Sequence, residues 1–121
     1  MTDTGWTWPV ARVAEVHDGD TLKLDIDLGF STHVLVWVRL MDVRAPELSE
    51  ADGQTARSDL LAWLGEYAPD SHVKVTTWRS SAPLEIRFRQ SFIRYVGIVT
   101  APNGAVLNNW LRAKGYIDRG Q

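Results

Sequence analysis

Four aspartates lie within ten residues of the stretch VHDGDTLKLDIDLGF, residues 16–30. The first two, Asp18 and Asp20, flank Gly19 and are followed by the hydroxyl group of Thr21. Carboxylates and hydroxyls are hard oxygen ligands of the kind that Ca²⁺ and Mg²⁺ prefer. The Asp-Gly pair is also a strong turn signal. Taken alone, these residues support a metal site and a plain turn equally.

Apolar and polar residues alternate directly after this turn. Leucine or isoleucine stands at 22, 24, 26 and 28, and polar residues stand at 23, 25 and 27. This period of two predicts a half-buried strand whose Asp25 and Asp27 face solvent. His17 is interpreted as a strand-end histidine rather than a ligand.

The same patterns predict the elements that must position these residues. Strands are expected at 11–17, 21–28, 33–41, 72–78 and 92–100, and helices at 54–68, ending near Gly65, and at 105–114, ending at Gly115. The segment 42–53 is expected to be a loop, and 79–91 a mobile loop or irregular hairpin. This order predicts a mainly β (α+β) fold, a five-stranded Greek-key barrel of the OB type with two to three helices. An open α+β sheet is the alternative.

Length and composition limit the classes of protein to which the chain can belong. The chain has 121 residues, 45% of them hydrophobic, which predicts one domain with 1–9 as a flexible or loosely attached segment. It has no cysteine, which excludes disulfides and thiolate metal sites. The N-terminus has neither a basic start nor a long apolar run, so a cytoplasmic protein without membrane attachment is expected.

The net charge of −2 conceals an asymmetry. Residues 1–70 carry 5 basic and 13 acidic side chains, whereas residues 71–121 carry 8 basic and 2 acidic ones. A uniformly basic surface for nucleic acid is therefore excluded. An acidic cluster facing a basic half suits a metal site beside a phosphate-binding surface, although two halves that neutralise each other explain the composition equally well.

Four stretches, VHDGDTLKL, VRLMDVRAPE, SFIRYVGIV and NGAVLNNWLRAKGY, together resemble the staphylococcal nuclease-like (thermonuclease) family. The resemblance runs from Arg12 to Tyr116. It implies an OB barrel that cleaves DNA and RNA phosphodiesters with one Ca²⁺, for which Mg²⁺ or Mn²⁺ are substitutes. It also implies single-stranded nucleic acid as the partner of a monomeric chain.

The resemblance also assigns roles to residues. Asp20 is similar to the metal ligand of the family, with Asp18 behind it, and Glu47 to the glutamate that activates or positions water. Arg39 and Arg94 resemble the two arginines that stabilise charge on the phosphate, which is the chemistry that phosphodiester hydrolysis requires. The substrate-binding residues implied are Arg39, Arg94, Phe92 and Arg89.

Several positions depart from the family pattern. Arg44 stands where the family has a second metal-binding aspartate, Ala45 can contribute only its carbonyl, and Asp42 is an alternative oxygen source. Ile93 replaces a glycine before Arg94 and cannot take the positive-φ conformations that glycine allows cheaply, so Arg94 is expected to be aimed differently. Two functions therefore stay open: a metal-dependent nuclease with weakened metal binding, or a degenerate domain that binds nucleic acid or a protein without cleavage. The tryptophans at 37, 63, 78 and 110 are expected in the core.

Overall fold

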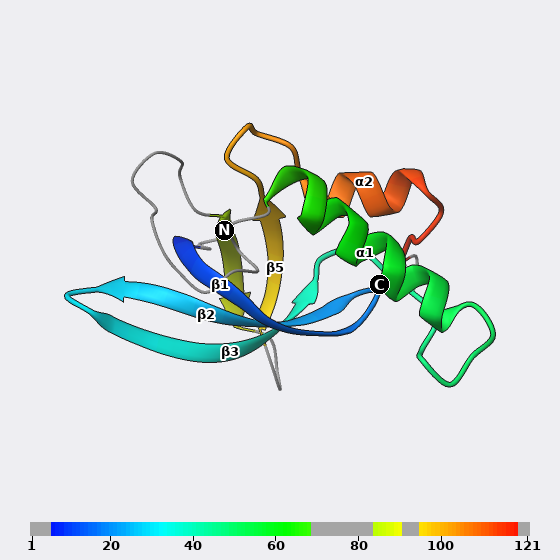
Figure 1. Cartoon of the computed structure of the whole chain (residues 1–121), viewed down its shortest axis with the longest axis horizontal. Coiled ribbons are helices and arrows are strands. Elements are labelled where there is room, and N and C mark those ends of the chain that lie inside the picture. The colour runs from blue at the N-terminus through cyan, green and yellow to red at the C-terminus, as the bar shows by residue number, and fades with distance from the viewer. Residues whose placement is uncertain (1–5, 69–83, 91–94, 119–121) are drawn as a thin grey trace.

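The computed structural model describes residues 6–68, 84–90 and 95–118, which form a closed five-stranded barrel and two helices (Figure 1). The strands are β1 (Trp6–Asp18), β2 (Thr21–Gly29), β3 (Thr32–Leu40), β4 (Leu84–Gln90) and β5 (Tyr95–Thr100), and the helices are α1 (Gly53–Tyr67) and α2 (Leu107–Ala113). The order around the barrel is β1-β2-β3-β5-β4, antiparallel except between β3 and β5, which are parallel. The expected mainly β barrel is confirmed, and the open-sheet alternative is wrong.

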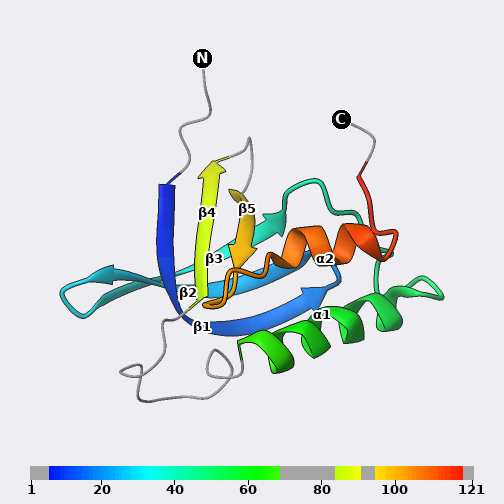
Figure 2. The same cartoon turned by 90° about the horizontal axis from the view of Figure 1, so that it is seen from above.

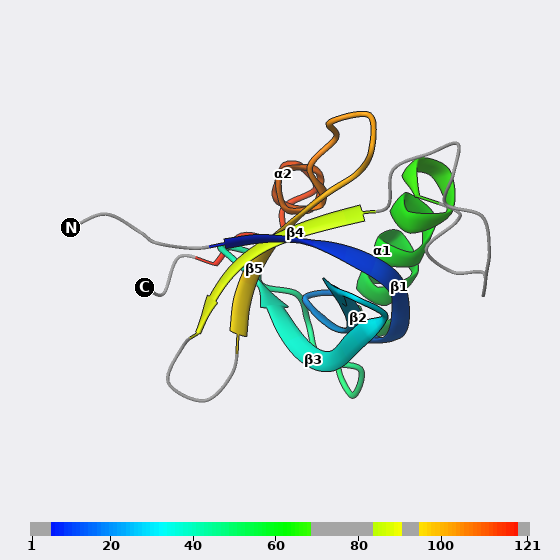
Figure 3. The ribbon, with the colours of Figure 1, turned by 90° about the vertical axis from the view of Figure 1, so that its left-hand side faces the viewer.

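The alternation of apolar residues determines what faces the barrel interior. Leu22, Leu24 and Ile26 of β2 are buried, as are Val38 and Leu40 of β3. Both helices lie outside the ring of strands, with α1 beside β1 (Figures 2 and 3). The β2–β3 hairpin extends beyond the barrel, away from the helices (Figures 1 and 2). Leu28, expected to face inward, is consequently exposed.

The fourth strand of the barrel corrects one expectation. Residues 84–90 form β4, although the segment 79–91 was expected to be a loop or irregular hairpin. Leu84 and Ile86 are fully buried and alternate with the exposed Glu85 and Arg87. Buried and exposed side chains thus alternate as in any half-buried strand, although the segment is charged. The strand expected at 72–78 lies outside the described residues.

The start of β1 corrects a second expectation. Residues 6–9, part of the segment expected to be loosely attached, pair with β4, from Trp6 with Phe88 to Pro9 with Glu85. Trp8 packs against the core, whereas Trp6 stays largely exposed. The first strand is thus longer than the expected 11–17, because its residues 6–10 pair with residues 84–88 of β4 and close the barrel.

The helix boundaries differ slightly from those expected. Helix α1 covers residues 53–67 rather than 54–68, and Gly65 lies inside it rather than at its end. Helix α2 is shorter than expected, and Gly115 follows it with a positive φ of 105°, a conformation that glycine adopts at little cost. The end of α2 at this glycine is therefore confirmed.

One buried amide joins α2 to the barrel. The Asn108 side chain accepts a hydrogen bond from the Val99 N–H through Oδ1, and its Nδ2 donates to the carbonyls of Met41 and Gly97, each at 3.0 Å. These bonds connect α2 with β5 and with the residue that follows β3. Because buried polar groups without partners are costly, this side chain fixes the position of α2.

The segment after α2 returns to the same end of the barrel. The Arg44 N–H donates to the Tyr116 carbonyl at 3.4 Å, and the Asp118 N–H donates to the Asp42 carbonyl at 3.1 Å. The Tyr116 hydroxyl donates to Oδ2 of Asp59 on α1 at 2.7 Å. Burial, with a smaller effect from the hydrogen bond to Asp59, raises the pKa of Tyr116 to about 12.

Replacing Tyr116→Phe should lower the free energy of unfolding by about 1–2 kcal/mol at neutral pH, because the bond to a carboxylate is lost. The native state holds the phenol proton more tightly than the unfolded chain, whose tyrosines have a pKa of about 10. Wild-type stability should therefore fall as the pH rises from about 10 toward about 12, and the difference from Tyr116→Phe should shrink. Denaturant unfolding at several alkaline pH values measures this.

The matched control is Tyr67→Phe, because the Tyr67 ring packs beside Trp63 and its hydroxyl forms no hydrogen bond with the described residues. An equal alkaline slope for Tyr116→Phe and the wild type would contradict the assignment of the proton to this bond.

Candidate functional site

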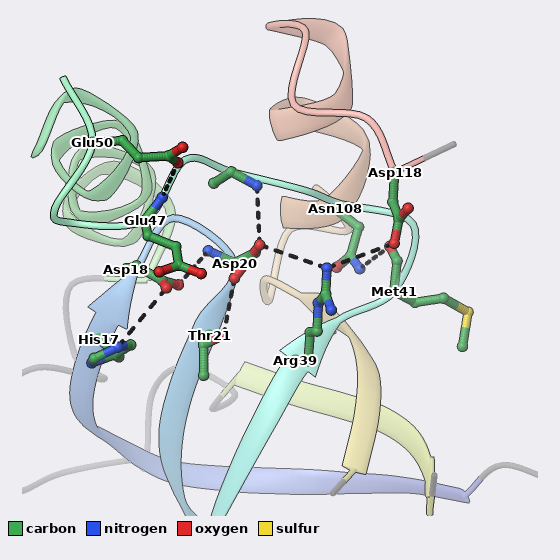
Figure 4. A network of polar contacts seen from close by, with 11 residues as sticks. His17, Asp18, Asp20, Thr21, Arg39, Met41, Glu47, Glu50, Asn108 and Asp118 are labelled. Atoms are coloured by element: carbon green, nitrogen blue, oxygen red, sulfur yellow. Dashed lines mark hydrogen bonds and ion pairs between the residues drawn. The ribbon is translucent and has the colours of Figure 1, made fainter. Parts of the chain in front are cut away.

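The turn between β1 and β2 carries two buried carboxylates. Oδ1 of Asp18 accepts the Asp20 N–H at 3.1 Å. Oδ2 of Asp20 accepts the Ala45 N–H at 3.0 Å, and its Oδ1 accepts the Thr21 hydroxyl at 2.9 Å (Figure 4). Asp18 is 8% exposed and Asp20 is 7% exposed. The Asp-Gly signal is thus a turn whose carboxylates are turned inward rather than toward bulk water.

Glycine is required in the middle of this turn. A Cβ atom on Gly19 would lie 2.6 Å from the Cβ of Ala45 and 2.7 Å from the Cβ of Ala56. Both distances are shorter than non-bonded carbon atoms tolerate, so any side chain here would push the turn away from the loop and from α1. The close packing holds Asp20 within hydrogen-bonding distance of the Ala45 backbone.

The environment of Asp20 opposes its ionisation. Burial raises the pKa of Asp20, and the neighbouring Asp18 carboxyl raises it further through a hydrogen bond and through charge repulsion, whereas the Ala45 N–H lowers it. An ionised carboxylate in this position is stabilised by any positive charge that comes close. The turn is therefore a place where a cation, from the chain or from solution, is favoured.

Arg39 supplies one such positive charge from the end of β3. Its Nη2 lies 3.9 Å from Oδ2 of Asp20 and 3.6 Å from Oδ2 of Asp118 (Figure 4). Both distances exceed hydrogen-bond length, so these are charge contacts rather than a bidentate pair. The guanidinium is half-buried between two carboxylates and keeps donors for a further anion.

An open cleft of about 980 Å³ adjoins these residues. The expected site residues that line it are Asp18, Asp20, Arg39, Ala45 and Glu47. Arg44, which departs from the family pattern, lines it too. In Figure 4 the Glu47 side chain extends from its loop toward the turn. Its backbone N–H donates to Oε1 of Glu50 at 2.8 Å, a bond in the second half of the loop between β3 and α1. The structure thus brings together residues that lie up to 29 positions apart in the sequence.

Of the other expected residues, only Asp42 has a described side chain, and it does not line this cleft. Asp42 is exposed, has a φ of 62° and is absent from the cleft lining; its carbonyl accepts the Asp118 N–H instead. Phe92 and Arg94 lie outside the described residues. Arg89 belongs to β4, where it pairs with Val96, and the position of its side chain is not described.

The donor set can be compared with the needs of a metal ion. Carboxylates of Asp18, Asp20 and Glu47 and the Ala45 backbone are oxygen donors, which suit Ca²⁺ or Mg²⁺ rather than a softer metal. Within residues 6–68, 84–90 and 95–118, however, no three acidic or histidine side chains form a group that could hold a metal ion. The donor chemistry thus suits a hard cation, but the described carboxylates do not by themselves form a metal-holding group, and Arg44 adds a positive charge to the same cleft.

Two residues near the site were missed or misassigned from the sequence. Asp118, which pairs with Arg39, belongs to no motif and follows a helix by several residues, so no sequence signal identifies it. Trp37, expected in the core, is 38% exposed on the outer face of the barrel, whereas Trp63 is buried as expected. His17 is exposed, lines the cleft and lies 4.0 Å from Oδ2 of Asp18.

Comparison of the chain with models of known protein families found none that matches. A search of curated proteins also found no match. In the part of the chain that the structure describes, neither helix has the length and apolar character needed to cross a membrane. The family resemblance therefore rests on the sequence motifs alone.

Proposed function

We propose that this chain is an OB-type Greek-key barrel of the staphylococcal nuclease-like kind that hydrolyses the phosphodiester bonds of single-stranded DNA or RNA with a divalent cation. The observation that carries the proposal is the position of Arg39. Its guanidinium lies beside the buried Asp20 in an open cleft that Glu47 also lines. The strand order, with β3 parallel to β5, supports the OB type.

Each of these residues has a chemical task in that reaction. Arg39 offers paired N–H donors that match two phosphoryl oxygens, where negative charge grows during hydrolysis. The exposed Glu47 carboxylate can accept a proton from the attacking water or hold it by a hydrogen bond. Asp20, Asp18 and the Ala45 carbonyl would hold the cation, which supplies charge stabilisation and activates water when bound.

A second candidate function, binding without cleavage, is favoured by Arg44. This arginine is exposed, lines the cleft and stands where the family resemblance requires a metal-binding carboxylate. A guanidinium attracts phosphate but repels a divalent cation. Such a cleft would hold a nucleic-acid backbone and leave it intact.

One experiment separates the two candidates. Single-stranded DNA and RNA oligonucleotides are incubated with the protein across a Ca²⁺ titration, with EDTA as the control, and binding is followed by fluorescence anisotropy in EDTA. Cleavage that depends on Ca²⁺ is expected. Binding without cleavage at any Ca²⁺ concentration would favour the second candidate, and the absence of both would contradict both.

Substitution of Arg39→Ala should slow cleavage by about 100- to 1000-fold, as loss of one charge-stabilising donor does at other sites. Arg39→Lys keeps the charge but not the paired donors, so it should restore only part of the rate. The matched control is Arg112→Ala, which removes an exposed arginine from the last turn of α2, away from the cleft lining. Cleavage by Arg39→Ala at the rate of Arg112→Ala would refute the assigned role.

The Arg44→Asp variant should bind Ca²⁺ at least tenfold more tightly and cleave at lower Ca²⁺. Two unit charges 4 Å apart interact by about 4 kcal/mol at an effective dielectric of 20, and this substitution changes the local charge by two units; exposure of Arg44 reduces the effect. Arg44→Gln is the control, because it removes the positive charge without adding a ligand. Calorimetric Ca²⁺ titration and cleavage rates measure both. If neither variant differs from the wild type, there is no metal site beside Arg44.

A further inference from the structure

A large aromatic side chain is exposed on the outer face of the barrel next to the cleft. Trp37 of β3 is 38% exposed. It lies two residues before Arg39, and successive side chains of a strand alternate between its two faces. Trp37 and Arg39 therefore lie on the same face of β3, about 7 Å apart along the strand.

The surroundings of Trp37 are continuous with the cleft. The ring of His17, which lines the cleft, meets the Trp37 ring edge-on, with 6.2 Å between centroids and an interplanar angle of 85°. On β2, Lys23 pairs with Trp37 and Thr21 pairs with Arg39 in the β2–β3 register. One surface thus carries an aromatic ring, a lysine and the arginine that faces the proposed phosphate position.

We propose that Trp37 is a stacking platform for one nucleobase of a single-stranded nucleic acid whose adjacent phosphate contacts Arg39. This inference rests on the proposed function, because the position of the base is inferred from a phosphate bound at Arg39. The two positions are about 7 Å apart along the strand, close enough for one short stretch of nucleic acid to reach both side chains. Stacking on aromatic side chains is how single-stranded nucleic acids bind OB barrels without reading sequence.

Lys23 contributes the charge that such a strand requires. Its Nζ lies 5.6 Å from the Trp37 ring centroid, near the limit of about 6 Å for a cation–π contact. The contact is therefore weak, and the long side chain can turn to a phosphate while a base takes its place over the ring.

Asp25, farther along this face, already has two partners. Asp25 contacts Nε of Arg12 at 3.3 Å and Nδ1 of His33 at 2.8 Å. Glu15 lies opposite Lys23 in the β1–β2 register. At the cleft end of this face, Lys23 and Arg39 are the positively charged side chains that a phosphate backbone can contact.

The test uses two fluorescently labelled probes of equal length, an oligothymidylate and an oligomer with the same sugar-phosphate backbone but no bases. Anisotropy titrations are made in EDTA, so that neither probe is hydrolysed. The wild type should bind the oligothymidylate more tightly. Trp37→Leu should weaken oligothymidylate binding by about tenfold and leave binding of the baseless probe unchanged. Trp37→Phe, which keeps an aromatic ring, should retain most of the affinity.

The matched control is Trp110→Leu. Trp110 also has a lysine over its ring, with Nζ of Lys114 4.6 Å from the ring centroid. Unlike Trp37, it belongs to α2, and it does not line the cleft. This variant should bind both probes like the wild type, and thermal melting checks that each variant is folded.

Three results would overturn the inference. Equal weakening of both probes by Trp37→Leu would mean that Trp37 supports the backbone site rather than a base. Unchanged binding of both probes would mean that no base stacks there, while the proposed function stands. A wild type that binds neither probe in EDTA would overturn this inference, whereas the Ca²⁺-dependent cleavage assay decides separately whether the proposed function stands.

Discussion

The candidate site depends on one buried carboxylate, that of Asp20. Its Oδ2 accepts the N–H of Ala45, and its own carbonyl accepts the N–H of Leu40 at 2.8 Å, so a single residue connects the β1–β2 turn with the end of β3 and with the loop that follows. The turn can approach this loop only because residue 19 is glycine. The cost of burying the charge, visible in the raised pKa of Asp20, is offset in part by the Ala45 N–H and the Thr21 hydroxyl, which both donate to the carboxylate.

Much of the barrel follows from patterns that are local in the sequence. The alternation in β2, the β-branched run of β3 and the glycine after α2 each predict structure without tertiary information. The strand β4 was missed because its exposed residues are charged and a proline precedes it, and such composition is typical of loops. What makes 84–90 a strand is pairing with β1 on one side and β5 on the other, and this long-range pairing leaves only a weak trace in the sequence.

The residues of the candidate site likewise fall into those that the sequence predicts and those that it does not. Asp18, Asp20, Arg39, Ala45 and Glu47 lie in two short motifs, so their meeting at one cleft was predictable from those motifs. The position of Trp37 was also predictable in principle: a strand that turns Arg39 outward must turn Trp37 outward too, so placing one in a site and the other in the core contradicts period two. Asn108 and Asp118 were not predictable, because their roles arise only when α2 and the segment after it fold back on the barrel.

Arg39 has a structural role in this cleft and, in the proposed function, a binding role as well. Its guanidinium makes charge contacts with Asp20 and Asp118 in the folded chain, and in the proposed function the same guanidinium binds a phosphate. The contacts of Arg39 with these carboxylates, at 3.6 and 3.9 Å in a cleft open to water, are weak. A phosphate that binds the guanidinium through two of its oxygens can therefore compete with them. The affinity of the cleft for a nucleic-acid backbone is therefore set by the two carboxylates as much as by the arginine, since each holds the guanidinium in place and each must share it.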